Sequence, residues 1–275
     1  MVESFPLDAR CDGEDCLRIV SIDEVDEDFF LNYLYSDKIL HFFTIYDLKF
    51  ERDKTKVWMA LEDEEISSYI FEFDRRIVHT HGSVRSIEAL MPCIDLEEYV
   101  FAIEPSHFSV VERFYRIVEP SDMESRGRVT NFLVLKVNHN TFRCVIKHSV
   151  KRLGIEDLDD IFRSFGGDWR GRVKREIERG FFYGAYEDGL LASIAACSEY
   201  IEDLAIIRGV YTVPSLRNRG FAISATSALV RELLDLGMEV ILWVARDNLP
   251  ARRVYEKIGF QDTGYRLLGF KAVKL

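Results

Sequence analysis

The sequence has no run of about 18 apolar residues, the length that a helix needs to cross a bilayer, so it predicts no membrane partner. Its first residues, MVESFPLDAR, include early acidic side chains and no apolar core of the kind found in secretory signals. The cysteines are odd in number and form no C-x-x-C pair: Cys11, Cys16, Cys93, Cys144 and Cys197. Together these absences favour a reduced protein of the cytoplasm.

Basic residues are scarce in the first half of the chain. Residues 1–140 contain 15 Lys and Arg against 29 Asp and Glu, whereas residues 141–275 contain 21 against 18. General nucleic-acid binding needs a basic surface, so the acidic balance argues against a nucleic-acid partner. An acidic first half is suited to attracting a cationic substrate, although it is equally explained as a surface that keeps the protein in solution.

Clusters of metal ligands are also lacking. His79 and His81 are two residues apart and would lie on the same face of a strand. However, no cysteine and no second histidine group lies near them in the sequence. Protein zinc sites usually combine four such ligands. We therefore predict no metal.

Apolar residues recur with helical and strand periods along both halves. The helices expected are 29–35, 84–91, 109–117, 157–165, 170–179, 220–236 and 250–258. The strands expected are 56–61, 68–73, 100–103, 132–137, 142–147, 181–186, 191–198, 204–213, 240–245, 260–264 and 266–273. Residues 1–16 and 120–128 have the composition of loops.

This order predicts an α/β fold with a mixed sheet. The turn residues Asn138, His139 and Asn140 suggest a boundary between domains at 1–138 and 139–275. Because the first half repeats the element order of the second in weaker form, we expect an internal structural repeat.

The most informative segment is 210–222, VYTVPSLRNRGFA, in which a strand leads through Arg-x-Arg-Gly-x-Ala into a long helix. The first amides of a helix lack intrahelical acceptors, and the helix dipole favours anions there. A glycine allows phosphates to approach the backbone closely, and arginines add charge-assisted contacts. The segment therefore predicts a pyrophosphate site.

A second segment follows at 242–260 and reads LWVARDNLPARRVYEKIGF. Residues 141–275 as a whole resemble the GNAT superfamily of N-acetyltransferases. Arg217, Gly220 and Ala222 match its Arg/Gln-x-x-Gly-x-Gly/Ala loop, and Asn248 with Tyr255-x-x-x-Gly-Phe matches its second signature. The resemblance implies a GNAT-like fold, with a tandem of two GNAT-like domains if the repeat is real.

The resemblance also implies roles for single residues. Asn248 would bond the pantetheine chain of acetyl-CoA, and Tyr255 would protonate the departing thiolate. The strand residues that would hold the pantetheine arm and polarise the acetyl carbonyl are Val210, Tyr211 and Thr212. The residues that would cradle the pyrophosphate are Arg217, Asn218, Arg219, Gly220, Phe221 and Ala222.

One position departs from the family pattern. Trp243 stands where some members carry a glutamate base. Glu199, Glu202 and Asp203 are alternative bases near the start of the preceding strand. The base is therefore left open by the sequence.

The functional expectation is an acetyl-CoA-dependent N-acetyltransferase that acts by direct attack of a primary amine. The alternative is a non-catalytic acyl-CoA sensor. The first half lacks the phosphate loop, since its counterpart stretch reads HGSVRS at 81–86, so we expect a degenerate repeat without a CoA site. Monomer and homodimer both remain open.

Overall fold

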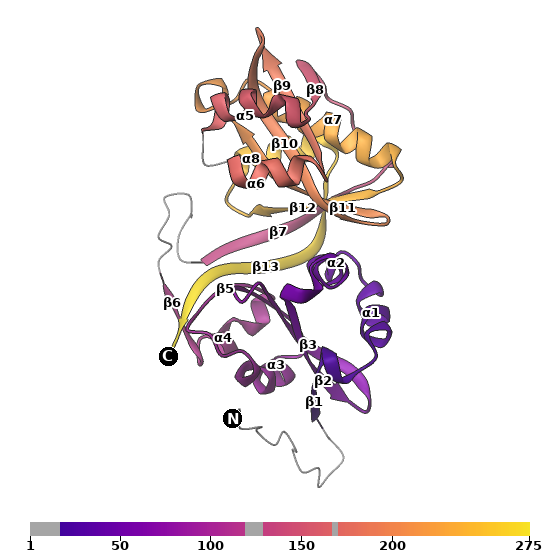
Figure 1. Ribbon diagram of the computed structural model, residues 1–275, viewed down its shortest axis with the longest axis vertical. Coiled ribbons are helices and arrows are strands. Elements are labelled where there is room, and N and C mark those ends of the chain that lie inside the picture. The colour runs from indigo at the N-terminus through magenta and orange to yellow at the C-terminus, as the bar shows by residue number, and fades with distance from the viewer. Residues whose placement is uncertain (1–16, 119–128, 167–169) are drawn as a thin grey trace. The chain divides into compact units, whose positions relative to one another are not determined.

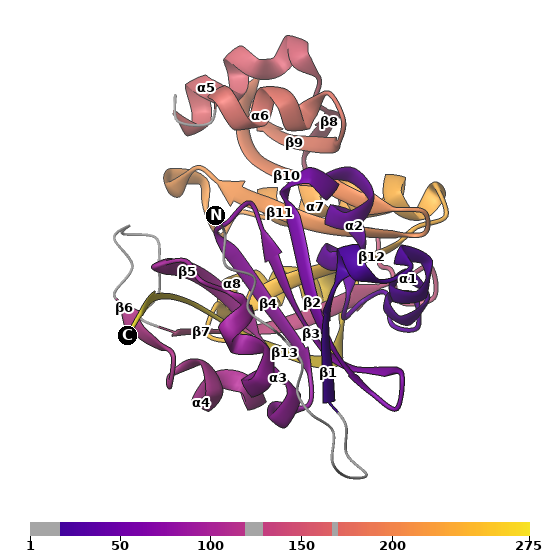
Figure 2. The ribbon, with the colours of Figure 1, turned by 60° about the horizontal axis from the view of Figure 1, so that its bottom comes forward.

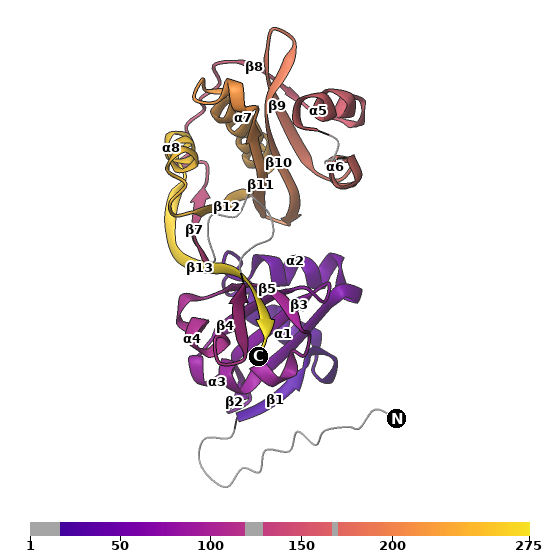
Figure 3. The same cartoon turned by 90° about the vertical axis from the view of Figure 1, so that its left-hand side faces the viewer.

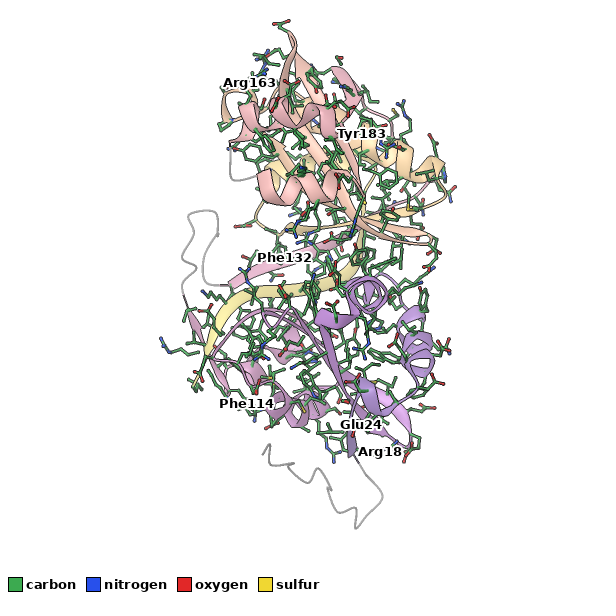
Figure 4. The ribbon with its side chains drawn as sticks, viewed as in Figure 1. Arg18, Glu24, Phe114, Phe132, Arg163 and Tyr183 are labelled. Atoms are coloured by element: carbon green, nitrogen blue, oxygen red, sulfur yellow. The ribbon has the colours of Figure 1, made fainter. Side chains whose placement is uncertain are left out.

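The computed structural model describes residues 17–118, 129–166 and 170–275, so the expected loops at 1–16 and 120–128 lie outside the described residues. The chain divides into two compact units, one of residues 1–132 with 266–275 and one of residues 133–265. The bounds differ from the expected 138/139 boundary chiefly because the last ten residues join the first unit. Phe132, where the division falls within a strand, is labelled in Figure 4.

Unit 1 is built on a mixed sheet. Its elements are β1 (Leu17–Ser21), α1 (Glu27–Tyr35), α2 (Phe42–Phe50), β2 (Thr55–Glu62), β3 (Glu65–Phe73), β4 (Ile77–Gly82), α3 (Val84–Leu90), β5 (Glu98–Ile103), α4 (Phe108–Val111) and β6 (Tyr115–Val118). Strands β1 to β4 pair antiparallel in sequence order, and β4 pairs parallel with β5. The last part of the chain, residues 268–274, pairs with β5 and β6.

Unit 2 repeats this design. Its elements are β7 (Val129–Val137), β8 (Ser149–Arg152), α5 (Leu158–Phe165), α6 (Arg170–Ile177), β9 (Phe181–Glu187), β10 (Leu190–Ile201), β11 (Leu204–Thr212), α7 (Phe221–Asp235), β12 (Glu239–Ala245), α8 (Leu249–Ile258) and β13 (Gln261–Lys274). Strands β8 to β11 pair antiparallel, and β11 pairs parallel with β12. β7 lies beyond β12 in the strand order.

The element order from β1 to β6 is the same as from β8 to β13: strand, two helices, three strands, helix, strand, helix, strand. The parallel pair stands at the same place in both. The expected α/β fold and internal repeat are therefore confirmed. No helix among the residues described is long and apolar enough to span a membrane.

Helices cover both faces of each sheet. In unit 2, α7 and α8 share one apolar core with the sheet, and α5 and α6 pack on the other face (Figures 1 and 3). In unit 1, α3 and α4 pack on one face and α1 and α2 lie on the other (Figure 2). Side chains fill the space between helices and sheet in both units (Figure 4).

The sequence-based assignment is wrong in three places. Residues 142–147 form no strand; the strand β8 begins only at Ser149. The expected helix 109–117 is the short α4 followed by β6, because Tyr115 begins to pair with the last strand. The two strands expected after Phe260 are one strand, β13, in which Gly264 adopts φ +89° without ending it.

Unit 1 also contains a buried polar cluster that no sequence pattern indicated. His41 Nδ1 lies 2.7 Å from the Tyr69 hydroxyl, and the His81 ring lies 5.1 Å from the His41 ring. His107 Nδ1 lies 2.8 Å from Thr80 Oγ1. Burial, and next the neighbouring His81, lowers the pKa of His41 to about 3, and burial lowers the pKa of His107. Both imidazoles are therefore neutral in the folded protein at neutral pH.

We expect unit 1 to lose stability in mild acid. Below pH 6.5 the unfolded chain binds a proton at His41, whereas the folded chain binds it only near pH 3. The free energy of unfolding therefore falls as the pH falls through this window. The loss for this one group is about 2 kcal/mol between pH 7.5 and 5. Urea unfolding at both pH values measures it. His41→Asn keeps a polar group near Tyr69 and cannot titrate, so a variant that loses as much stability as the wild type would contradict the assignment.

Candidate functional site

Strands β11 and β12 pair over only part of their length. Leu204 pairs with Glu239, and the register continues to Ile207 with Leu242 and no further. β11 continues to Thr212 and β12 to Ala245, so the two parallel strands separate beyond that point. The register between β11 and β12 thus covers only the first half of β11, and the second half is extended backbone of the kind to which an extended ligand can add.

A β-bulge accompanies the separation. Arg208 pairs with Ala196 and Tyr211 with Ile194, so two residues of β11 oppose one of β10. Gly209 within the bulge adopts φ +70°, a left-handed conformation that glycine adopts at little cost. Since bulges bend a strand and increase its twist, this one accounts for the departure of β11 from β12.

The loop after β11 leads into α7 with unsatisfied backbone donors. A 3-10 turn at Pro214–Leu216 is followed by left-handed Asn218 (φ 63°) and Gly220 (φ 93°). No side chain caps the helix. The backbone N–H groups from Asn218 to Ile223 donate to no acceptor among the described residues, and the first amide bonded to the loop is Ser224 N, to Gly220 O at 3.2 Å. Such a row of amides at a helix N-terminus is suited to phosphate.

The two arginines of the loop are held differently. The Arg219 guanidinium makes a two-pronged ion pair with the Glu187 carboxylate, with one contact at 2.8 Å, and lies over the Phe221 ring. Arg217 has no ion pair among the described residues; its Nε donates to Thr212 O at 3.3 Å and its guanidinium lies over the Tyr211 ring. Both side chains are exposed. Arg217 is therefore the more readily available cation.

An extended segment, residues 143–148, runs along α7 toward this loop, and we call it the strap. Arg143 N donates to Ile258 O at 2.7 Å, and the amides of Val145 and Lys147 donate to Ser227 Oγ (2.8 Å) and Ser224 Oγ (3.0 Å). These serines are buried in α7 and give the strap the partners that a strand would find in a sheet. The strap ends with His148, whose Nε2 lies 2.8 Å from Arg219 O.

The second signature forms the start of α8 and its buried face. Asn248 is the N-cap of α8, and its Oδ1 accepts from Ala251 N at 3.4 Å, which leaves its amide donors pointing elsewhere. Tyr255 is 8% exposed and packs edge-on against Phe260 within the unit 2 core. Burial raises the pKa of Tyr255 to about 12, so its hydroxyl is protonated at neutral pH.

Residues 182–267 match the family model described as FR47-like protein. That match runs from β9 into β13. It includes both signatures, the loop at 217–222 and the segment from Asn248 to Phe260. No curated protein matches this sequence.

Solved structures resemble the chain over nearly its whole length. A Drosophila protein is 16% identical, covers 95% of this chain and 98% of its own, and has a TM-score of 0.63. A GNAT-family acetyltransferase from Colwellia psychrerythraea is 13% identical over 92% and 99%, with a TM-score of 0.57. A tandem GNAT protein from the clavulanic acid biosynthesis pathway is 12% identical over 94% and 98%, with a TM-score of 0.57.

The fold is that of GNAT acetyltransferases. The resemblance inferred from residues 141–275 is thereby confirmed, and so is the tandem of two GNAT-like halves. At these identities the similarity shows the fold alone. The roles expected for single residues remain predictions.

The structure brings most of the predicted GNAT site residues into one region. Val210, Tyr211 and Thr212 lie on β11 beyond the separation, and residues 217–222 form the loop and the first turn of α7. Of the proposed bases, Glu202 and Asp203 lie at the opposite end of β11, about 30 Å of extended chain from the loop. Glu199 is committed to Arg208, with a 2.6 Å contact.

The corresponding place in unit 1 is closed by the protein itself. Gly82 N donates to Glu104 Oε1 (3.3 Å), and Ser83 N donates to Ser68 Oγ (2.7 Å). Ser83 also caps α3 by accepting from Ser86 N. A Cβ on Gly82 would lie 2.3 Å from Ser67 O, so no space separates this turn from β3. Two amides of this turn, those of Gly82 and Ser83, therefore have side-chain acceptors.

Sequence reasoning missed the strap and the Glu187 ion pair. Glu187 ends β9, and it meets Arg219 only because the hairpin brings β9 beside β10. The strap left one signal, the polar pair Ser224 and Ser227 inside an apolar helix. Buried hydroxyls need partners, so these serines indicate a segment lying on the helix.

We expect Glu187→Gln to tighten CoA binding. The substitution releases Arg219 from its carboxylate, and exposed ion pairs contribute up to about 1 kcal/mol, so affinity should rise up to about five-fold. Calorimetric titration with CoA measures it. Asp188→Asn removes the same charge one residue away without touching Arg219. Equal tightening in both variants would mean that only net charge matters, and weaker binding in Glu187→Gln would mean that the pair holds the loop in shape.

Proposed function

We propose that this protein is an acetyl-CoA-dependent N-acetyltransferase that transfers the acetyl group to a primary amine. The observation that carries the proposal is the row of unsatisfied amides from Asn218 to Ile223, placed at the mouth of the opening between β11 and β12. The fold of the chain supports it, because GNAT acetyltransferases share this fold.

The residues present fit the chemical parts of CoA. Its pyrophosphate would accept from the amides of 218–223, with Arg217 as the available cation. Its pantetheine arm has amide groups that would match the extended backbone of β11 at residues 210–212, which lies beyond the residues paired with β12. Asn248 would offer the amide donors that its capping bond leaves over. No metal enters this proposal.

The reaction forms one C–N bond and breaks one C–S bond. The amine nitrogen attacks the thioester carbonyl and loses a proton, while the sulfur departs as a thiolate and gains one. Backbone donors on β11 would stabilise the carbonyl oxygen as it becomes negative. Holding both reactants in line supplies a further large part of the acceleration.

Tyr255 would serve the departing sulfur. An acid must be protonated before it acts, and burial keeps the Tyr255 hydroxyl protonated with a pKa of about 12. An ordinary thiol has a pKa near 8.5, so complete transfer from this phenol is uphill. We therefore assign the hydroxyl to donating a hydrogen bond to the sulfur as the C–S bond breaks.

The acceptor is proposed as an amine that carries positive charge before it reacts. The excess of Asp and Glu in residues 1–140 motivates this choice, since negative charge attracts ammonium groups. The general base is not assigned to a side chain. A chain of water molecules that leads to bulk solvent is sufficient to take up the proton that the amine must lose.

The second candidate is a protein that binds acyl-CoA and does not turn it over. Trp243 in place of a glutamate favours it, whereas the buried and protonated Tyr255 favours the enzyme. Thermal stabilisation by acetyl-CoA without thiol release across a broad amine panel would support the sensor. Thiol release that depends on an added amine would support the enzyme.

We expect one acetyl-CoA site per chain, abolished by Arg217→Glu together with Arg219→Glu. Each charge-assisted contact contributes about 1.5–3 kcal/mol, so reversing both charges should weaken binding by at least about 100-fold. Calorimetry gives the stoichiometry and the affinity. Arg163→Glu with Arg175→Glu makes the same charge change on α5 and α6 and should bind normally. Unchanged affinity in the loop variant would remove the loop from the site.

We expect Tyr255→Phe to lower kcat by about 100-fold and to change KM for acetyl-CoA by less than about two-fold. The hydroxyl acts only as the sulfur leaves, so the loss belongs to the transition state. Steady-state kinetics with the best amine of the panel measure both constants. Because phenylalanine preserves the packing against Phe260, the melting temperature should hold. An unchanged kcat would exclude Tyr255 from the reaction.

A further inference from the structure

The phosphate loop is a strained segment with few contacts of its own. Asn218 lies in the left-handed region at φ 63° and Gly220 at φ 93°, with Arg219 between them. Non-glycine residues occupy that region at a cost and need surrounding contacts to remain there. The contacts that fix the backbone on either side of Gly220 come from the strap and from α7.

His148 bonds the first of these peptide groups. A carbonyl oxygen can only accept, so His148 Nε2 carries the proton and donates to Arg219 O at 2.8 Å. The imidazole also lies on the Phe221 ring, with centroids 3.9 Å apart. A Cβ built on Gly220 would lie 3.4 Å from the same nitrogen, so the ring covers the glycine.

The second peptide group is bonded through Ser224. Its Oγ donates to Gly220 O at 3.1 Å and accepts from Lys147 N at 3.0 Å. The strap therefore reaches both carbonyls, one directly and one through a serine. These contacts arise from residues that lie more than 70 positions before the loop in the sequence.

Peptide planarity turns these carbonyl contacts into an orientation of the amides. In a trans peptide the C=O and the following N–H point in opposite directions. Because Arg219 O points at His148, Gly220 N–H points away from the strap. Gly220 O, fixed by Ser224, similarly sets Phe221 N–H. These two amides belong to the row that lacks acceptors.

We propose that His148 is a positioning residue of the acetyl-CoA site: it holds the Arg219–Gly220 peptide so that the amides of the phosphate loop face the pyrophosphate. The inference rests on the proposed function. It goes beyond it by assigning part of the site to the strap, which carries none of the recognised motifs. His148 contacts the loop and not the reacting atoms, so its loss affects binding and leaves the chemical step unchanged.

Three substitutions separate the hydrogen bond from ring packing. His148→Ala removes both, His148→Phe keeps a ring on Phe221 without the donor, and His148→Gln places an amide donor near the position of Nε2. A neutral hydrogen bond contributes about 0.5–1.5 kcal/mol, so Ala and Phe should weaken CoA binding in calorimetry by about 3- to 10-fold. Gln should stay within about two-fold of the wild type. Where an amine substrate is known, kcat should be unchanged in all three.

Hydrogen exchange of residues 217–224 without ligand tests the same contact independently of activity. Ala and Phe should speed exchange there, and Gln should restore the wild-type rate, while β9 and β10 exchange as before. Ser224→Ala, a substitution that a helix accepts well, should also speed exchange of the loop.

The outcomes distinguish the two hypotheses. A wild type that binds no CoA would refute the proposed function, and the exchange rates would then decide whether His148 holds the loop. If the wild type binds CoA and His148→Phe binds it with the same affinity, the hydrogen-bond donor is irrelevant. That result would overturn the inference about His148 and leave the proposed function standing. The inference about His148 would also be overturned if His148→Gln bound CoA as weakly as His148→Ala and its loop amides exchanged as fast.

Discussion

The interruption of pairing between β11 and β12 is the constraint from which the rest of unit 2 follows. Parallel strands in one sheet normally continue side by side, and backbone groups that lose a partner need another one. Here the bulge at Gly209 turns β11 away after Ile207, so an edge of backbone opens inside the sheet. The strand then leads the chain to the start of α7, where the amides of residues 218–223 have no acceptor within the described part of the chain. The proposed sites for an extended ligand and for its phosphates therefore both depend on this one irregularity.

Unit 1 shows how the same fold satisfies the same positions internally. Its parallel pair, β4 and β5, also runs for four residues, from Ile77 with Val100 to Thr80 with Ile103. Beyond it, Glu104 and His107 turn inward and bond Gly82 N and Gly82 O. Ser83 caps the helix that follows. In unit 1, side chains of Glu104, His107 and Ser68 thus bond backbone groups at this position.

Local patterns predicted the parts of the fold that depend on local chemistry. The apolar residues up to Val213 predicted a strand and those from Gly220 onward a long helix, as β11 and α7 confirm, because strand and helix periods are properties of adjacent residues. Gly209 was read as part of an unbroken strand, since one glycine in an apolar run does not reveal which residues it will oppose. The structure gives the positions of the predicted site residues, and their roles remain predictions.

Pairings between distant segments were beyond such patterns. Residues 142–147 have the alternation of a strand, but their amides bond to serines of α7 some 80 residues later. Likewise, nothing local in residues 266–275 indicates that they pair with β5 and β6 rather than completing the half to which they belong in sequence. A strand's apolar faces specify burial, and the choice of partner follows from the whole topology.

The strap illustrates why a binding loop draws on residues outside its motif. A loop that presents bare amides cannot use those amides to stabilise itself, and side chains that capped them would occupy the ligand's place. The backbone groups that remain to hold the loop in place are the carbonyls, which point to the opposite side of each peptide plane. Ser224 and His148 donate hydrogen bonds to these carbonyls. The strap that carries His148 is itself held by Ser224 and Ser227. The amides of residues 218–223, which have no acceptor among the described residues, and the buried serines of α7 are therefore parts of one arrangement: the protein satisfies the carbonyls, and the amides keep the orientation that the proposed phosphate site requires.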